Sequence, residues 1–184
     1  GSKKNILAHY DLSNDFYKLW LDPTMTYSCA IFNNDNTSLE DASLEKLDRI
    51  CRKINLNKND HLLEIGTGWG SFSLHAAKKY GCKITTTTIS DSQYDYALSK
   101  IHEQNLSDKI TLVKKDYRHL EGSYDKIVSI EMIEAVGHQY LATYFNACHR
   151  LLKSKGKFVL QAITIPHKRY ANYLKFSDWI QKHI

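Results

Sequence analysis

Hydrophobic positions recur along the chain in short blocks with two alternating patterns. Blocks that are β-branched and apolar on both faces are typical of buried parallel strands. Such blocks lie at 61–66, 83–89, 109–114, 125–131 and 157–165. Blocks with apolar residues at helical spacing lie between and before them, at 38–54, 70–80, 91–105 and 138–152. This alternation predicts an α/β fold with a doubly wound parallel sheet and right-handed crossovers.

Boundary signals support the predicted helices. Ser38 and Asp41 form an S-x-x-D pattern that predicts a helix start. Gly81 and Gly156 follow predicted helices, where C-caps belong. Outside the alternating region, the aromatic-rich pattern predicts one or two short helices over 5–22 and another helix over 169–183.

Composition narrows the class of protein. The chain has 184 residues, 42% of them hydrophobic and 24% charged, which is ordinary for one globular domain. It contains no run of about 18 apolar residues and no apolar leader, so we expect neither a membrane span nor a signal peptide. The formal net charge of +5 favours an anionic partner. Four cysteines without C-x-x-C spacing predict free thiols in a reducing compartment and no metal site.

A glycine-rich turn follows the first predicted strand, at Gly66-Thr67-Gly68-Trp69-Gly70. Glycines there allow a sharp turn and close approach of a ligand at the carboxyl ends of the strands. The spacing is neither that of a dinucleotide fold nor that of a phosphate loop. Glu64, just before the turn, suits a cationic or hydroxyl-rich ligand, so S-adenosylmethionine fits. A simple tight turn without a ligand is the alternative.

Two further sites extend this hypothesis. The second strand ends in Thr88-Ile89-Ser90 without an acidic residue, so Thr88 or Gln93 would have to hold the ribose. Asp116, after the third strand, is suited to accept from an adenine amino group, or it caps a turn. Trp69 is interpreted as a wall of the site, with core packing as the alternative.

Several motifs resemble the cyclopropane fatty acid synthase family, which includes the mycolic acid cyclopropane synthases. The motifs are HYDLSNDFY (9–17), LDP (21–23), YSCA (27–30), EIGTGWG (64–70), TISDSQ (88–93), DYR (116–118) and VSIEMIE (128–134). They cover nearly the whole chain, and the first block is more specific than the glycine turn. The resemblance implies a Rossmann-like class I methyltransferase with an N-terminal helical extension.

The resemblance also implies an activity. It is methyl transfer from S-adenosylmethionine to the double bond of unsaturated fatty acyl chains of phospholipids, which gives a cyclopropane or methylene-branched product. Cofactor-binding positions carried over are Tyr10, Tyr27, Ser28, Leu62, Leu63, Glu64, Ile65, Gly66, Thr67, Gly68, Trp69, Gly70, Thr88, Ile89, Ser90, Gln93, Asp116, Tyr117 and Arg118. Catalytic positions are Glu134, Cys29 and Gln161, with Glu134 and the Cys29 backbone helping to hold a bicarbonate ion.

Chemical reasoning is consistent with these roles. An alkene is a weak nucleophile, so the methyl donor must be aligned and water excluded. Methyl transfer leaves a carbocation, which the aromatic faces of Tyr10, Tyr17 and Tyr27 are placed to stabilise. A base must then remove a proton, and a bicarbonate ion held by hydrogen bonds suits that task.

The chain departs from the family in two respects. Gln161 stands where the well-known synthases have a histidine that donates to bicarbonate; glutamine donates a hydrogen bond but does not titrate. Loss of a different proton would then give a methylene branch instead of a ring. Family members also continue beyond the last residue of this sequence, so we expect the fold to be C-terminally incomplete.

These inferences predict three segments. Residues 1–37 are a helical cap over the cofactor, 38–165 the S-adenosylmethionine-binding domain, and 166–184 the start of a lid or acyl-pocket region. The basic and aromatic segment 166–184 could contact an anionic membrane, so we expect a cytoplasmic protein with peripheral contact at the inner membrane face. We expect no nucleic-acid partner. A methyltransferase for small molecules, or an incomplete fragment that only binds the cofactor, are the alternatives.

Overall fold

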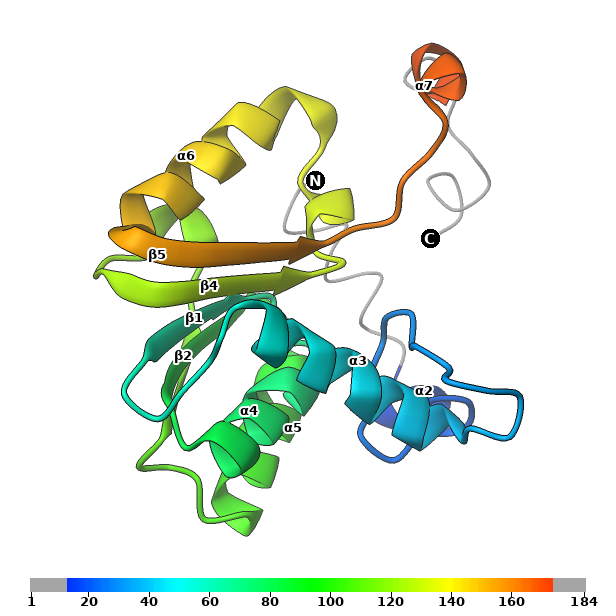
Figure 1. The fold of residues 1–184 in the computed structure, drawn as a ribbon, viewed down its shortest axis with the longest axis vertical. Helices are drawn as coiled ribbons and strands as arrows, with labels where there is room; N and C mark the ends of the chain where they lie inside the picture. Colours follow the sequence, from blue (N-terminus) through cyan, green and yellow to red (C-terminus); the bar gives the residue numbers. More distant parts are fainter. Residues whose placement is uncertain (1–12, 174–184) are drawn as a thin grey trace.

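A wholly parallel sheet of five strands forms the centre of residues 13–173, the part of the chain that the computed structural model describes (Figure 1). Its strands are β1 (His61–Ile65), β2 (Lys83–Thr88), β3 (Ile110–Lys114), β4 (Tyr124–Ile130) and β5 (Leu152–Gln161). The spatial order is β3-β2-β1-β4-β5. From β1 the chain adds β2 and β3 on one side and then β4 and β5 on the other, so the strand order switches between β1 and β4. Ligands bind at such a switch point in doubly wound sheets.

The helices of the described residues are α2 (Asn14–Lys18), α3 (Leu39–Lys53), α4 (Ser71–Tyr80), α5 (Asp91–Glu103), α6 (Leu141–Leu151) and α7 (His167–Tyr173). Helices α3, α4 and α5 cover one face of the sheet and α6 covers the other, whereas α7 stands apart from it (Figure 1). Helices α3, α4 and α5 pack with Leu62 and Val128 in one core, while α6 packs with Leu63 and Ile127 in a second core. Neighbouring residues of a strand point to opposite faces, so each strand contributes to both cores.

The predicted architecture is confirmed. All five predicted strands are present and parallel, and the helices between them are α4, α5 and α6. Ser38 caps α3 by accepting from the backbone N–H of Asp41 at 3.0 Å. Gly81 ends α4 in the left-handed conformation, with a φ of 68°.

The start of the last strand was predicted wrongly. Gly156 lies inside β5 and caps no helix, because β5 begins at Leu152, directly after α6. A Cβ on Gly156 would lie 2.9 Å from the carbonyl oxygen of Asp125, so glycine here permits close packing against β4. Residues 153–156 are polar or glycine and resemble a loop, but a strand paired along one side tolerates such residues.

The ends of the chain are described in part. The helix predicted over 5–22 is represented by α2, and the one predicted over 169–183 by α7, which begins at His167. The remaining residues of both predictions lie outside the described part, as does Tyr10. Within residues 13–173, no helix is long and apolar enough to cross a membrane.

Candidate active site

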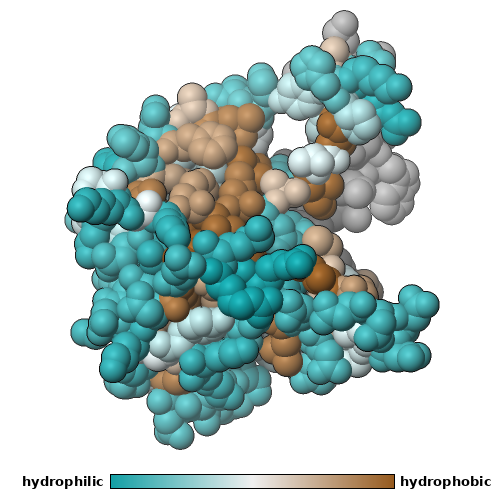
Figure 2. Space-filling view, in the orientation of Figure 1, coloured by the Kyte–Doolittle hydropathy of each residue, from teal (hydrophilic) through white to brown (hydrophobic). Residues whose placement is uncertain are grey.

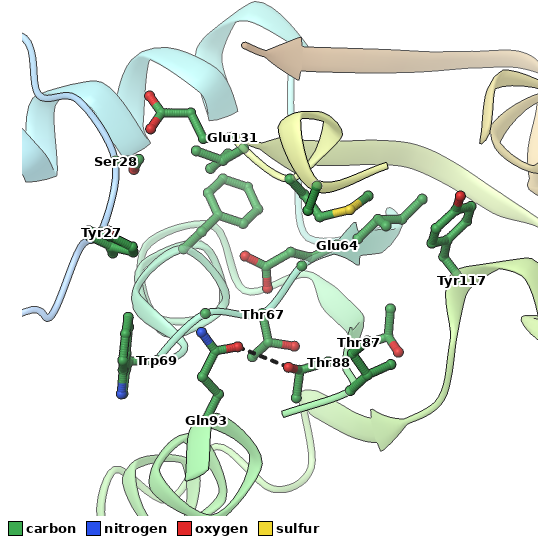
Figure 3. Close-up of a pocket in the computed structure, with 18 of the residues that line it drawn as sticks. Tyr27, Ser28, Glu64, Thr67, Trp69, Thr87, Thr88, Gln93, Tyr117 and Glu131 are labelled. Carbon is green, nitrogen blue, oxygen red and sulfur yellow. Dashed lines mark hydrogen bonds between the residues drawn. The ribbon is translucent and has the colours of Figure 1, made fainter. Parts of the chain in front are cut away.

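A cavity of about 700 Å³ lies at the carboxyl ends of β1, β2 and β4 (Figure 3). Its lining comes from the glycine turn after β1, the segments after β2, β3 and β4, and the N-terminal stretch around Tyr27. A volume of this size accommodates a cofactor or a drug-sized ligand.

The glycine turn opens directly onto the cavity. The backbone N–H groups of Gly66 and Thr67 both donate to the carbonyl oxygen of Thr87, at 3.1 and 3.0 Å. Gly66 and Gly68 have φ values of 99° and 54°, a region that favours glycine. A Cβ added to Gly68 would have no heavy atom within 4 Å. The turn therefore leaves room for a ligand to approach its backbone.

Glu64 lies beneath this turn and is 2% exposed. It accepts hydrogen bonds from the hydroxyl of Ser73 and, at 2.6 Å, from that of Thr86. Burial raises the pKa of Glu64 to about 7, and these hydrogen bonds oppose the rise. A carboxyl group that ionises near neutral pH is suited to accept from a cationic or hydroxyl-bearing ligand.

The end of β2 contributes a second wall. The Thr88 hydroxyl donates to the side-chain oxygen of Gln93 at 2.9 Å (Figure 3). This bond turns the carbonyl side of Gln93 toward Thr88 and leaves the amide NH₂ as a donor. Thr88, Ile89 and Gln93 all line the cavity. Ser90 does not; it caps α5 by accepting from the backbone N–H of Gln93.

Asp116 begins the turn after β3. Its carboxylate accepts from the backbone N–H and the guanidinium of Arg118, at 2.9 Å and 2.6–2.9 Å. The Arg118 guanidinium holds the pKa of Asp116 below its usual range. The turn-capping interpretation of Asp116 thus matches the structure, and Asp116, Tyr117 and Arg118 also line the cavity.

Aromatic side chains form the wall opposite β2. Trp69 packs on Tyr17 with ring centroids 4.5 Å apart, and its Nε1 donates to Asn14 at 2.8 Å. Trp69 lines the cavity and belongs to a small core with Met25, so both interpretations of Trp69 apply. Tyr27 also lines the cavity, whereas Tyr17 is buried behind it.

A polar cluster closes the end of the cavity next to Ser28. The Cys29 backbone N–H and the Gln161 side-chain NH₂ both donate to Oε1 of Glu131, at 3.0 and 2.8 Å. Nearby, the buried Lys46 donates to the Ser28 hydroxyl at 2.5 Å. Burial lowers the pKa of Lys46 to about 8. Burial and the contact with Glu131 raise the pKa of the Cys29 thiol, which disfavours a nucleophilic thiolate.

Several predicted site residues lie elsewhere. Glu134 is exposed, lies outside the lining and accepts from the backbone N–H of Ile163 at 2.6 Å. Leu62 and Leu63 are fully buried in the two cores, because neighbouring residues of β1 point to opposite faces of the sheet. Gly70 and Ser90 cap helices and are absent from the lining.

Sequence reasoning assigned no role to Glu131 or Lys46. Glu131 directly follows β4, and Glu64 lies one residue before the end of β1. Both glutamates therefore lie at the carboxyl ends of neighbouring strands, where ligands bind in such sheets, and this position could have marked Glu131 as a site residue. Lys46 lies within the amphipathic α3, where a lysine predicts a solvated face; the structure leaves it 2% exposed.

The bicarbonate ion does not fit the donors assigned to it. The Cys29 N–H and the Gln161 NH₂ are both engaged by Glu131, and Glu134 contacts Ile163 instead. An anion placed there would meet the Glu131 carboxylate. No role for bicarbonate is therefore derived.

The sheet order, the glycine turn and the cavity at the switch point define a Rossmann-like fold of the class I methyltransferase type. Residues 2–184 match the family described as mycolic acid cyclopropane synthetase. The chain belongs to this family.

Named relatives agree with this assignment. The chain is 39% identical over 190 residues to tuberculostearic acid methyltransferase UfaA1 of Mycobacterium tuberculosis, covering 100% of this chain and 44% of that protein. It is 38% identical over 176 residues to cyclopropane-fatty-acyl-phospholipid synthase of Escherichia coli, covering 96% and 44%.

A solved structure is similar throughout. Mycolic acid cyclopropane synthase CmaA1, complexed with SAH and CTAB, superposes with a TM-score of 0.87 at 31% identity, covering 99% of this chain and 63% of that one. The chain spans about half the length of the curated relatives that it matches, 44% in both cases given above.

Proposed function

We propose that the cavity binds S-adenosylmethionine and that the protein transfers its methyl group to the double bond of an unsaturated acyl chain of a phospholipid. The product would be a cyclopropane or a methylene branch. The observation that carries this proposal is a single cavity that combines the open glycine turn, the buried Glu64 and an aromatic wall. Membership of the cyclopropane synthetase family supports the lipid substrate.

The residues fit this methyl donor. Gly68 leaves open space at the turn where a Cβ would otherwise project. The turn also lacks the sequence of a phosphate loop that would hold a nucleotide tail. Glu64 would accept from a hydroxyl or cationic group, and the free amide donor of Gln93 would contact the ribose side. Tyr117 and Arg118 would lie toward the adenine, and Tyr27 and Ser28 toward the methionine end.

The chemistry divides between the ligand and the chain. Bound S-adenosylmethionine supplies an electrophilic methyl group on a sulfonium. The chain would align that group and exclude water from it, since an alkene competes poorly with water as a nucleophile. The faces of Tyr27 and Trp69 would stabilise the positive charge that develops on the acyl chain.

The decisive experiment supplies labelled S-adenosylmethionine and vesicles of monounsaturated phospholipid to the natural full-length polypeptide. We expect label in acyl products one carbon heavier. A ring and a methylene branch are isomers of equal mass, so NMR of the products distinguishes them. Methylation of small amines or metabolites with no lipid product would favour the small-molecule alternative. Donor binding without any product would favour a cofactor-binding module.

Gly68→Val tests the cofactor site separately. A valine at a φ of 54° would project into the space that the donor needs, so we expect calorimetric binding of S-adenosylmethionine to be lost. Gly81→Val is the matched control, because Gly81 has a φ of 68° but lies at the end of α4, outside the cavity lining. Similar affinity in both variants would contradict the proposed site.

A further inference from the structure

Glu131 has a backbone conformation that is unusual for a residue with a side chain. Its φ is 48°, in the left-handed region that glycine adopts easily and a side chain with a Cβ adopts at a cost. Such residues are retained where the surrounding structure holds them, and they gather at functional sites. The strain at Glu131 therefore calls for a reason in its side chain.

The side chain is held by donors from distant segments. Cys29 N–H reaches Oε1 from the N-terminal stretch, and Gln161 Nε2 reaches the same oxygen from the end of β5. These are two of the donors that the family resemblance assigns to bicarbonate. Oε1 thus occupies the place of an anion oxygen, on a carboxylate that belongs to the chain itself.

The Glu131 side chain shares the cavity with the other polar groups of the site. Glu131 lines the same cavity as Glu64 and Tyr27, at the end marked by Ser28 in Figure 3. Burial and the charge of Glu131 raise the pKa of Tyr27. The same charge opposes the lowering of the pKa of Lys46 by burial, so all three groups interact within one site. Two hydrogen bonds hold the Glu131 carboxylate in place, and its Oε1 atom accepts both of them.

We propose that Glu131 is the proton acceptor of this enzyme, in place of a bound bicarbonate ion. The inference rests on the proposed function. When the alkene takes the methyl group, the electron pair of the breaking C–S bond stays on sulfur and a carbocation forms on the acyl chain. The Glu131 carboxylate then removes a proton from the new methyl group. The C–H electron pair forms the third ring bond. If a 1,2-hydride shift first moves the cation to the methyl-bearing carbon, the same electron pair instead forms a methylene double bond. In both cases the neutral carboxylic acid returns its proton to solvent.

The first test compares Glu131→Gln with wild type in the full-length polypeptide, using the lipid assay. Glutamine keeps an oxygen for the Cys29 and Gln161 donors but accepts no proton. We expect turnover to fall at least about 100-fold, the usual contribution of a general base, with little change in donor affinity. Glu103→Gln, which alters an exposed carboxylate on α5, is the matched control.

The second test uses Glu131→Gly, which removes the carboxylate and relieves the positive φ. We expect an equal or higher melting temperature, and binding of ¹³C-labelled formate by NMR that wild type does not show. Formate or bicarbonate should restore product formation in this variant, while wild type should work equally well in carbonate-free buffer.

The outcomes separate the two proposals. Normal turnover by Glu131→Gln, a loss confined to Glu134→Gln, or bound formate that restores nothing would overturn the role of Glu131 and leave the proposed function intact. Loss of product formation by the wild-type enzyme in carbonate-free buffer would also overturn the role of Glu131. Absence of any lipid product from wild type would remove both proposals.

Discussion

Single residues decide the chemistry of the cavity through burial. Glu64 and Lys46 are both almost fully buried, and burial shifts their pKa values toward neutrality from opposite directions. A group that titrates near neutral pH responds strongly to a ligand of opposite charge. The two residues therefore make ligand affinity depend on pH.

Glu64 gives the clearest prediction at this scale. Its pKa is raised to about 7, so the free protein holds a proton there as pH falls below 7. A ligand that donates to the carboxylate favours the ionised form, and protonation opposes its binding. We expect calorimetric affinity for S-adenosylmethionine to weaken between pH 8 and 5.5, by at most about tenfold per unit.

Glu64→Gln serves as the comparison. It should bind more weakly than wild type at pH 8 and show a flatter profile, since no proton is taken up at this position. An equally steep profile in the variant would assign the pH dependence to another group, with Lys46 the next to examine.

Residues that line the cavity could be located from the sequence where their position depends on local order. The glycine turn, Gln93 and the Asp116–Arg118 segment follow strand ends, and strand ends can be located by pattern. The partners of Glu131 lie 30 and 102 residues away, and spacing cannot reveal contacts across such distances. Glu134 was favoured by the motif alone and proved to contact the backbone of Ile163.

At the scale of elements, one carboxylate joins α3 to α4. Asp48 of α3 is bonded to the Tyr80 hydroxyl and the Lys79 ammonium, both at 2.8 Å, and to His75 at 3.3 Å. It also pairs with Arg52 on its own helix. These partners hold the pKa of Asp48 well below its usual range, despite burial that acts in the other direction.

Asp48→Asn should therefore destabilise the fold, by about 2 kcal/mol in urea unfolding at pH 7. The contribution of a carboxylate with a depressed pKa is fully present above its unfolded pKa near 4 and is lost as pH falls further. The difference between wild type and variant should thus shrink toward pH 3. Glu103→Gln, at an exposed pair, should leave stability almost unchanged.

The elements themselves were predicted well because their signals are local. The strands are short blocks rich in β-branched and apolar residues, and capping residues mark the starts of α3 and α5. The prediction for segment 152–156 was wrong because its lysines and glycine are typical of a loop. In the structure, Leu152 pairs with Tyr124 of β4 and Lys153 forms an ion pair with Asp125 at 2.7 Å. The register shifts after this point, and regular pairing resumes at Lys157, opposite Lys126.

At the scale of the whole molecule, charge and exposed apolar groups bear on membrane contact. The net charge is +5, and large apolar side chains including Phe32, Ile163 and Ile165 are exposed. Figure 2 shows hydrophobic residues gathered over the region of α6 and the ends of β4 and β5, with hydrophilic residues around them. We propose that the protein contacts anionic membranes at their surface, with α7 contributing basic residues.

This predicts salt-dependent binding to anionic vesicles in a flotation assay. Lys168→Glu with Arg169→Glu, both exposed on α7, should weaken binding by about tenfold or more. The control replaces Lys58 and Lys83 with glutamate. These two lysines lie near the amino ends of β1 and β2, away from the cavity. Equal loss in both double variants would indicate a response to net charge alone and not to a membrane-facing surface.

The backbone N–H groups of Gly66 and Thr67 both donate to the carbonyl oxygen of Thr87. They join the turn after β1 to the end of β2, so two sides of the cavity are braced against each other before any ligand arrives. Little conformational freedom is then left to lose on association, which favours affinity. Amide hydrogens of Gly66 and Thr67 should accordingly exchange slowly with heavy water even in the ligand-free protein.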